Sequence, residues 1–245
     1  MGASNMTTRK RHIKLFYILI LILIAVAFFS TATLADDTGW VSASGVKPSN
    51  DPPDNSANAY QNFVDLDPAL WYREGIDYVL EAGLFQGISA TRFAPDQPMT
   101  RAMFVTVLHR MEGLPDGYGN SPFFDVGNGM WYTAAVIWAN DKGIVKGYND
   151  TAFGPNDYLT REQMVAILYR YAIYKGYNLS ASEHDSIFSY VDYDSISDYA
   201  ILPMQWAFRT TLIEGMNAST LNPKGLITRA QAATIIMRFY KNVVK

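Results

Sequence analysis

Three stretches of the chain carry apolar residues at helical spacing, and a threonine precedes each of them. The threonines are Thr100, Thr160 and Thr228. Threonine is a favoured N-cap, and a glutamine three residues later, Gln163 or Gln231, completes a capping box in the second and third stretches. Met103 replaces that glutamine in the first stretch. The pattern predicts three helices, each with a single apolar stripe along one face.

A shorter helix is predicted ahead of each of these three. In the first two copies its apolar positions are Trp71, Ile76, Val79 and Leu80, and then Trp131, Ala135, Trp138 and Ala139. Gly83 and Gly143 follow where a helix C-cap adopts a positive φ. Thr211 takes that position in the third copy, so we expect that helix to end differently. We expect Trp138 and Trp206 to pack in the core, because aromatic residues at helical spacing usually do.

The same landmarks recur three times in the same order, which identifies an internal repeat. Gly87, Gly147 and Gly215 lie 60 and 68 residues apart, and the three threonines keep those separations. A helical pair of about 50 residues has too little core to be stable alone. We therefore predict an all-α domain in which three helix-loop-helix repeats pack around a shared core with pseudo-threefold symmetry.

The first 35 residues have the layout of a secretory signal peptide. Four basic residues precede an apolar run, residues 15–29, and small residues up to Ala35 follow it. The run is shorter than the roughly 20 residues that span a bilayer, so we expect cleavage after Ala35, with an uncleaved signal anchor as the alternative. Residues 36–60 are rich in Asp, Ser, Asn and Pro and are expected to form a flexible linker, or else an ordered cap on the first repeat.

Charge and cysteine content narrow the classes of partner. The chain has no cysteine, which excludes disulfides and thiolate metal sites. Removing residues 1–35 takes four of the 20 Lys and Arg residues and none of the 23 acids, which leaves 16 against 23 and a net charge of −7. We do not expect a chain of this charge to bind nucleic acid.

Taken together, the repeated motifs resemble those of the S-layer-homology family. That family's repeat combines an aromatic-x-Asp start, a Trp-bearing helix, a glycine-rich connection and a helix that starts Thr-Arg-Ala-Glu. The last motif reads Thr100-Arg-Ala-Met, Thr160-Arg-Glu-Gln and Thr228-Arg-Ala-Gln in this chain. The resemblance covers residues 61 to 242 and places the repeats at 61–112, 121–175 and 188–242. It implies a three-pronged helical spindle that binds secondary cell-wall polysaccharide, often pyruvylated, in grooves between adjacent repeats.

The resemblance also implies which residues contact the acidic sugar. They are the arginines Arg101, Arg161 and Arg229, the aspartates Asp65, Asp125 and Asp192, the tryptophans Trp71 and Trp131, and the glycines Gly87, Gly147 and Gly215. Tyr199 stands where the third Trp is expected, and the family's loop acid survives only as Asp150. The third groove therefore departs furthest from the family.

The chemistry of these residues leaves simpler roles open. An arginine directly after an N-cap lies beside unpaired backbone donors, and its planar fork suits a carboxylate ligand. The arginines could equally be solvated, Trp71 and Trp131 could belong to the core, and each aspartate could cap the turn that follows it.

No pattern in the chain is typical of an enzyme or a metal site. His12, His109 and His184 do not recur with the repeat, and no nucleophile, phosphate-loop or metal-ligand spacing is present. We expect no cofactor and no catalysis, but a module on the surface of a bacterium with a Gram-positive-type envelope that binds secondary cell-wall polysaccharide. The alternative is a module that binds other surface-layer proteins. Membrane contact is expected only if the N-terminal segment is retained.

Overall fold

The computed structural model of the protein describes residues 63–180 and 187–244. The expected signal peptide and linker lie outside the described residues. The α-helices of the described part are α2 (Arg73–Glu81), α3 (Arg101–Met111), α4 (Thr133–Asp141), α5 (Arg161–Lys175), α6 (Ile201–Arg209) and α7 (Arg229–Phe239). Short 3-10 helices at Ile187–Ser189, Tyr193–Ser195 and Asp198–Ala200 precede α6, and a π-helix, Tyr240–Val244, follows α7. These residues contain isolated β-bridges but no strand, so the predicted all-α class is confirmed.

The three threonines cap α3, α5 and α7 as predicted. Thr100 accepts a hydrogen bond from the Met103 amide at 3.2 Å. Thr160 and Thr228 form complete capping boxes with Gln163 and Gln231. The side-chain oxygen satisfies an amide that no helical carbonyl can reach, which fixes the first turn of each helix.

Two details at the ends of the shorter helices differ from expectation. Trp71 and Trp131 lie in the turn before α2 and α4 rather than on the helices, because these helices begin at Arg73 and Thr133. Thr211 adopts a φ of 56°, close to the 66° and 68° of Gly83 and Gly143. The expectation of a different ending in the third copy was therefore wrong. Asn242 donates to the Thr211 hydroxyl at 2.8 Å, which helps to hold a conformation that disfavours a β-branched residue.

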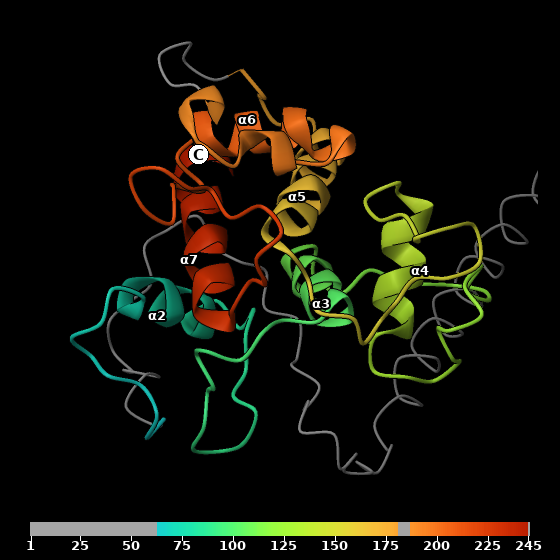
Figure 1. Cartoon of the computed structure of the whole chain (residues 1–245). Coiled ribbons are helices and arrows are strands. Elements are labelled where there is room, and N and C mark those ends of the chain that lie inside the picture. The colour runs from blue at the N-terminus through green and yellow to red at the C-terminus, as the bar shows by residue number, and fades with distance from the viewer. Residues whose placement is uncertain (1–62, 181–186, 245) are drawn as a thin grey trace, which may run out of the picture. The chain divides into compact units, whose positions relative to one another are not determined.

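Each shorter helix packs on the longer helix of another repeat. Helix α4 lies against α3, α6 lies against α5, and α2 of the first repeat lies against α7 of the third (Figure 1). The α2 to α7 contact is close, since a Cβ atom at Gly75 would come within 2.6 Å of the Thr234 hydroxyl. Every repeat therefore shares an interface with both of the others.

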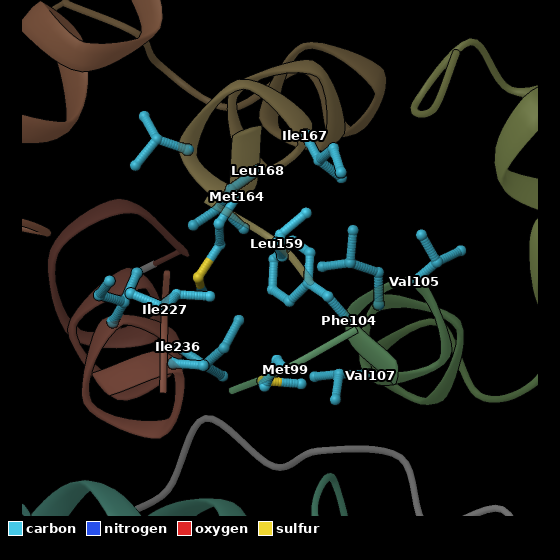
Figure 2. Packing of buried hydrophobic residues seen from close by; sticks show 14 of the residues in the cluster. Met99, Phe104, Val105, Val107, Leu159, Met164, Ile167, Leu168, Ile227 and Ile236 are labelled. Carbon is cyan, nitrogen blue, oxygen red and sulfur yellow. The ribbon is translucent and has the colours of Figure 1, made fainter. Parts of the chain in front are cut away.

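Backbone hydrogen bonds join the repeats in a closed ring at the residue just before each threonine cap. The Met99 amide donates to Ile227, the Ile227 amide to Leu159, and the Leu159 amide to Met99, at 2.9, 2.9 and 2.8 Å. All three side chains are fully buried. Figure 2 shows apolar residues of α3, α5 and α7 facing a common centre, among them Phe104 and Met164. The described repeats thus share one core, whereas the spindle shape stays a prediction.

None of the helices in residues 63–180 and 187–244 has the length and apolar content needed to cross a bilayer.

Candidate functional site

Each of the three repeated arginines reaches from the start of its helix into the loop of another repeat. Arg101 donates Nε to Phe153 O and Nη2 to Lys146 O, at 2.8 and 3.0 Å. Arg161 donates to Leu221 O and Glu214 O at 3.1 and 2.9 Å. Arg229 donates to Phe93 O and Gln86 O at 2.8 and 2.6 Å. The first repeat thus holds the second, the second holds the third, and the third holds the first.

These arginines are buried, so the alternative that they are solvated is wrong. Only 5%, 5% and 0% of Arg101, Arg161 and Arg229 is exposed. Burial lowers the pKa of Arg101 and Arg161, and lowers that of Arg229 to about 10. The guanidinium of Arg101 also lies 4.6 Å from the ring centres of Tyr148 and Phe153. Contact of these arginines with a sugar stays a prediction, and much of their bonding capacity already holds the fold together.

The three aspartates bind the same loops through main-chain amides, whereas the arginines bind main-chain carbonyls. Asp65 accepts the amides of Phe93 and Ala94 at 2.9 and 2.8 Å. Asp125 does the same for residues 153 and 154, and Asp192 for residues 221 and 222. Each aspartate therefore organises a loop 28 to 30 residues away, and not the turn that directly follows it. The Phe93 amide donates to Asp65 and the Phe93 carbonyl accepts from Arg229, so one residue contacts both motifs.

The three loop glycines provide space for the aromatic residue of the aromatic-x-Asp motif. A Cβ atom at Gly147 would lie 2.6 Å from a ring carbon of Phe123. A Cβ atom at Gly215 would lie 2.6 Å from a ring carbon of Tyr190, and one at Gly87 would collide with Phe63. These distances leave no room for a side chain, which gives the repeated glycine a packing role.

The tryptophans of the described residues differ in exposure. Trp138 and Trp206 are each 3% exposed and belong to the core, as expected. Trp71 is 64% exposed and meets Tyr72 edge to face, while Trp131 is half-buried. Tyr199, at the third position, donates its hydroxyl to the buried Glu162 at 3.2 Å. Trp71 is thus the aromatic side chain of this set that is most available to a ligand.

A groove of about 380 Å³ brings several of the predicted residues together on the surface of α7. Trp71 comes from the first repeat, Arg161 from the second and Gly215 from the third. The rest of the lining is Leu212, Ile213, Glu214, Met216, Gln231, Thr234, Ile235 and Arg238. A lining that is about half polar and half apolar, with an exposed indole and charged groups, is suited to a sugar ring that bears an acidic group.

Sequence reasoning missed a second repeated arginine. Arg110, Arg170 and Arg238 each lie nine residues after the first arginine of their helix, and so keep the same separations of 60 and 68. Arg110 donates to Leu84 O at 2.9 Å and Arg170 to Ile144 O at 2.7 Å. Arg238 instead forms an ion pair with Glu214 at 3.4 Å, inside the groove. The shared spacing of nine residues could be read from the sequence, but it did not indicate that Arg238 has a different kind of partner from Arg110 and Arg170.

A cluster of polar residues also fixes the third repeat against α5. The Glu162 carboxylate accepts hydrogen bonds from the Ser197 amide and hydroxyl at 3.0 and 2.9 Å, and pairs with Lys224 at 2.6 Å. Within the described part of the chain, no group of three or more His, Asp or Glu residues is placed to hold a metal ion.

Comparison with known proteins agrees with the repeat structure. The family model of the S-layer homology domain matches residues 62–103, 122–165 and 189–233. The chain is 32% identical over 170 residues to "Exoglucanase XynX" of Acetivibrio thermocellus, which is 68% of this chain and 15% of that protein. It is 34% identical over 183 residues to "Endoglucanase" of Bacillus sp. (strain KSM-635), 75% of this chain and 19% of that protein.

A third relative is named as a surface-layer component. The "S-layer protein" of Bacillus thuringiensis subsp. finitimus is 26% identical over 187 residues, 74% of this chain and 22% of that protein. The chain therefore spans less than a quarter of the length of each of these relatives. From three tandem matches in register with three interlocked repeats, it follows that the chain belongs to the S-layer homology domain family.

Proposed function

We propose that this chain anchors a protein or an assembly to the bacterial cell wall by binding an acidic, pyruvylated secondary cell-wall polysaccharide. The S-layer homology domain is a non-catalytic anchoring domain, and the family together with relatives named as S-layer proteins supports a wall-associated protein of Gram-positive-type bacteria. Relatives named as enzymes align with this chain over a small share of their length. The absence of catalysis in this chain stays a prediction.

The observation that carries the proposal is the groove on α7. It combines an exposed indole, Trp71, with the guanidinium groups of Arg161 and Arg238. An aromatic face binds the apolar side of a sugar ring, and a guanidinium binds a carboxylate through charge-assisted hydrogen bonds. A neutral or purely apolar ligand would have no anionic group to offer these guanidinium groups.

Co-sedimentation with purified cell walls tests this function. The full-length chain, kept in solution with a mild detergent, should sediment with intact walls and not with walls stripped of their secondary polysaccharide. Trp71→Ala should weaken retention by roughly three- to tenfold, because one aromatic contact is lost. Tyr118→Ala is the matched control, since Tyr118 is also exposed but does not line the groove. Equal retention on stripped walls would exclude polysaccharide as the ligand.

One observation favours a second function, contact with other surface-layer proteins. The middle residue of each aromatic-x-Asp motif is apolar and largely exposed, at 81% for Val64, 81% for Phe124 and 78% for Val191. These three equivalent apolar side chains offer the same exposed surface on each repeat to a protein partner. Replacing all three by serine should leave binding to intact walls unchanged if polysaccharide is the partner. Loss of binding in that variant would favour the protein-interaction module.

A further inference from the structure

The groove on α7 contains a loosely held ion pair between Glu214 and Arg238. The main-chain carbonyl of Glu214 accepts a hydrogen bond from Arg161, which fixes the backbone of the loop. Its carboxylate lies 3.4 Å from Nη2 of Arg238. The side chains of Glu214 and Arg238 are 69% and 30% exposed, so solvent screens their attraction. The carboxylate can therefore leave Arg238 at small cost, while the backbone stays in place.

The other two repeats lack this arrangement. Arg110 and Arg170 occupy the positions equivalent to Arg238, and each donates to a main-chain carbonyl that cannot swing away. The positions equivalent to Glu214 hold Gln86 and Lys146, neither of which is an anion. Arg238 is thus the member of the set whose described ion-pair partner is an exposed carboxylate on a rotatable side chain.

Arg161, the other arginine of the groove, has fewer N–H groups free for a ligand than Arg238. Arg161 is 5% exposed, and its Nε and Nη2 groups are both bonded to main-chain carbonyls of the third repeat. A ligand that takes these groups would break the contact between two repeats. Arg238 can exchange one carboxylate for another without such a loss, and its planar fork suits a carboxylate on a sugar.

We propose that Arg238 binds the anionic group of the ligand in the α7 groove, and that Glu214 competes with that group for Arg238 when the groove is empty. This inference rests on the proposed function and adds a specificity-determining residue to it. The Glu214 carboxylate acts as an intramolecular substitute for the carboxylate of the polysaccharide. A neutral glycan has no group that can replace this carboxylate, so it leaves the pair with Arg238 intact and gains no affinity from Arg238.

Equilibrium binding of the full-length chain to purified wall polysaccharide tests the inference. Glu214→Gln removes the competitor and should tighten binding by roughly two- to fivefold, the strength of an exposed ion pair. Arg238→Ala should weaken binding by on the order of tenfold or more, since a charge-assisted hydrogen bond is lost. In the Arg238→Ala background the Glu214→Gln change should have no effect, because both act through one contact.

Two controls separate this effect from general charge. Glu74→Gln makes the same change of charge in an exposed ion pair with Lys241, whose residues do not line the groove, and should leave affinity unchanged. The same polysaccharide with its carboxylates chemically reduced to alcohols should bind wild type and Glu214→Gln equally. Tightening by Glu74→Gln, or tightening by Glu214→Gln on the reduced polymer, would overturn the inference.

The failure of this inference differs from failure of the proposed function. If the wild-type chain does not bind the polysaccharide at all, the proposed function is wrong, and the inference that rests on it is overturned as well. If wild type binds and both Glu214→Gln and Arg238→Ala bind like wild type, the proposed function is retained, but Arg238 does not bind the anionic group of the ligand. Glu214→Gln alone decides the matter if Arg238→Ala does not fold, because Glu214 is exposed.

Discussion

Arg229 is expected to be among the residues on which the stability of the whole described domain depends. Its side chain is fully buried and donates to Phe93 O and Gln86 O, which lie in the first repeat. Arg229→Ala leaves both carbonyls unsatisfied and opens a cavity beside the Phe93 ring, whose centre lies 4.5 Å from the guanidinium. A buried carbonyl left without a partner typically costs about 1 to 3 kcal/mol, so for two carbonyls we expect a loss of about 2 to 6 kcal/mol in the free energy of unfolding.

Urea denaturation followed by far-UV circular dichroism measures this loss. Arg92→Ala is the matched control, since it removes the same charge from a side chain that is 64% exposed and should change the free energy of unfolding by less than about 0.5 kcal/mol. Arg229→Lys keeps the charge, but its single ammonium cannot reproduce the two-pronged contact, so it should fall between wild type and Arg229→Ala. Equal urea midpoints for Arg229→Ala and Arg92→Ala would refute the view that Arg229 fastens the third repeat to the first.

Three further predictions concern the loops and one histidine. Ala94 has a φ of 59°, and the equivalent residue of the second repeat is Gly154. Ala94→Gly should therefore raise the free energy of unfolding by roughly 1 kcal/mol, and Gly154→Ala should lower it. The opposite order of melting temperatures would contradict a left-handed backbone at these positions. Gly87→Ala should cost on the order of 1 to 3 kcal/mol, because its methyl group would collide with Phe63 and with the main-chain oxygens of Ser89 and Arg92. A melting temperature equal to that of wild type would contradict this packing role. Burial lowers the pKa of His109 below its ordinary value of 6.5, because the neutral imidazole is favoured in the folded protein. The folded protein should therefore be most stable above pH 6.5 and should lose stability as the pH falls below that value. Urea midpoints at about pH 8 and about pH 5 should differ less in His109→Gln than in wild type, and an equal difference would exclude His109 as the cause.

The repeated offsets in the sequence were sufficient to predict the helical class and the shared core. Thr100, Thr160 and Thr228 predicted the starts of three helices, because capping depends on residues only three positions apart. The stripe that each helix presents is likewise a local property. Three stripes on units too small to fold alone have few ways to be buried other than against one another.

The roles of the arginines and aspartates could not be predicted from the residues alone. Arg229 bonds to carbonyls 136 and 143 residues earlier in the chain, and no local pattern specifies such a partner. Asp65 caps a loop 28 residues away for the same reason. The left-handed Thr211 was missed because a β-branched residue seldom takes that conformation. Its contact with Asn242 forms only once the π-helix that follows α7 is in place.

The closed ring of contacts also determines the order in which the domain can be completed. The first repeat receives Arg229 only after the last helix has been synthesised, so the contact that closes the ring has the longest sequence separation of the three arginine contacts. Contacts of long separation form slowly, since loop closure must precede the gain from burial. Until residue 229 arrives, the carbonyls of Phe93 and Gln86 and the α2 face that packs on α7 have no partner from the third repeat. We therefore expect a nascent chain to depend on protection from aggregation until its last helix has docked.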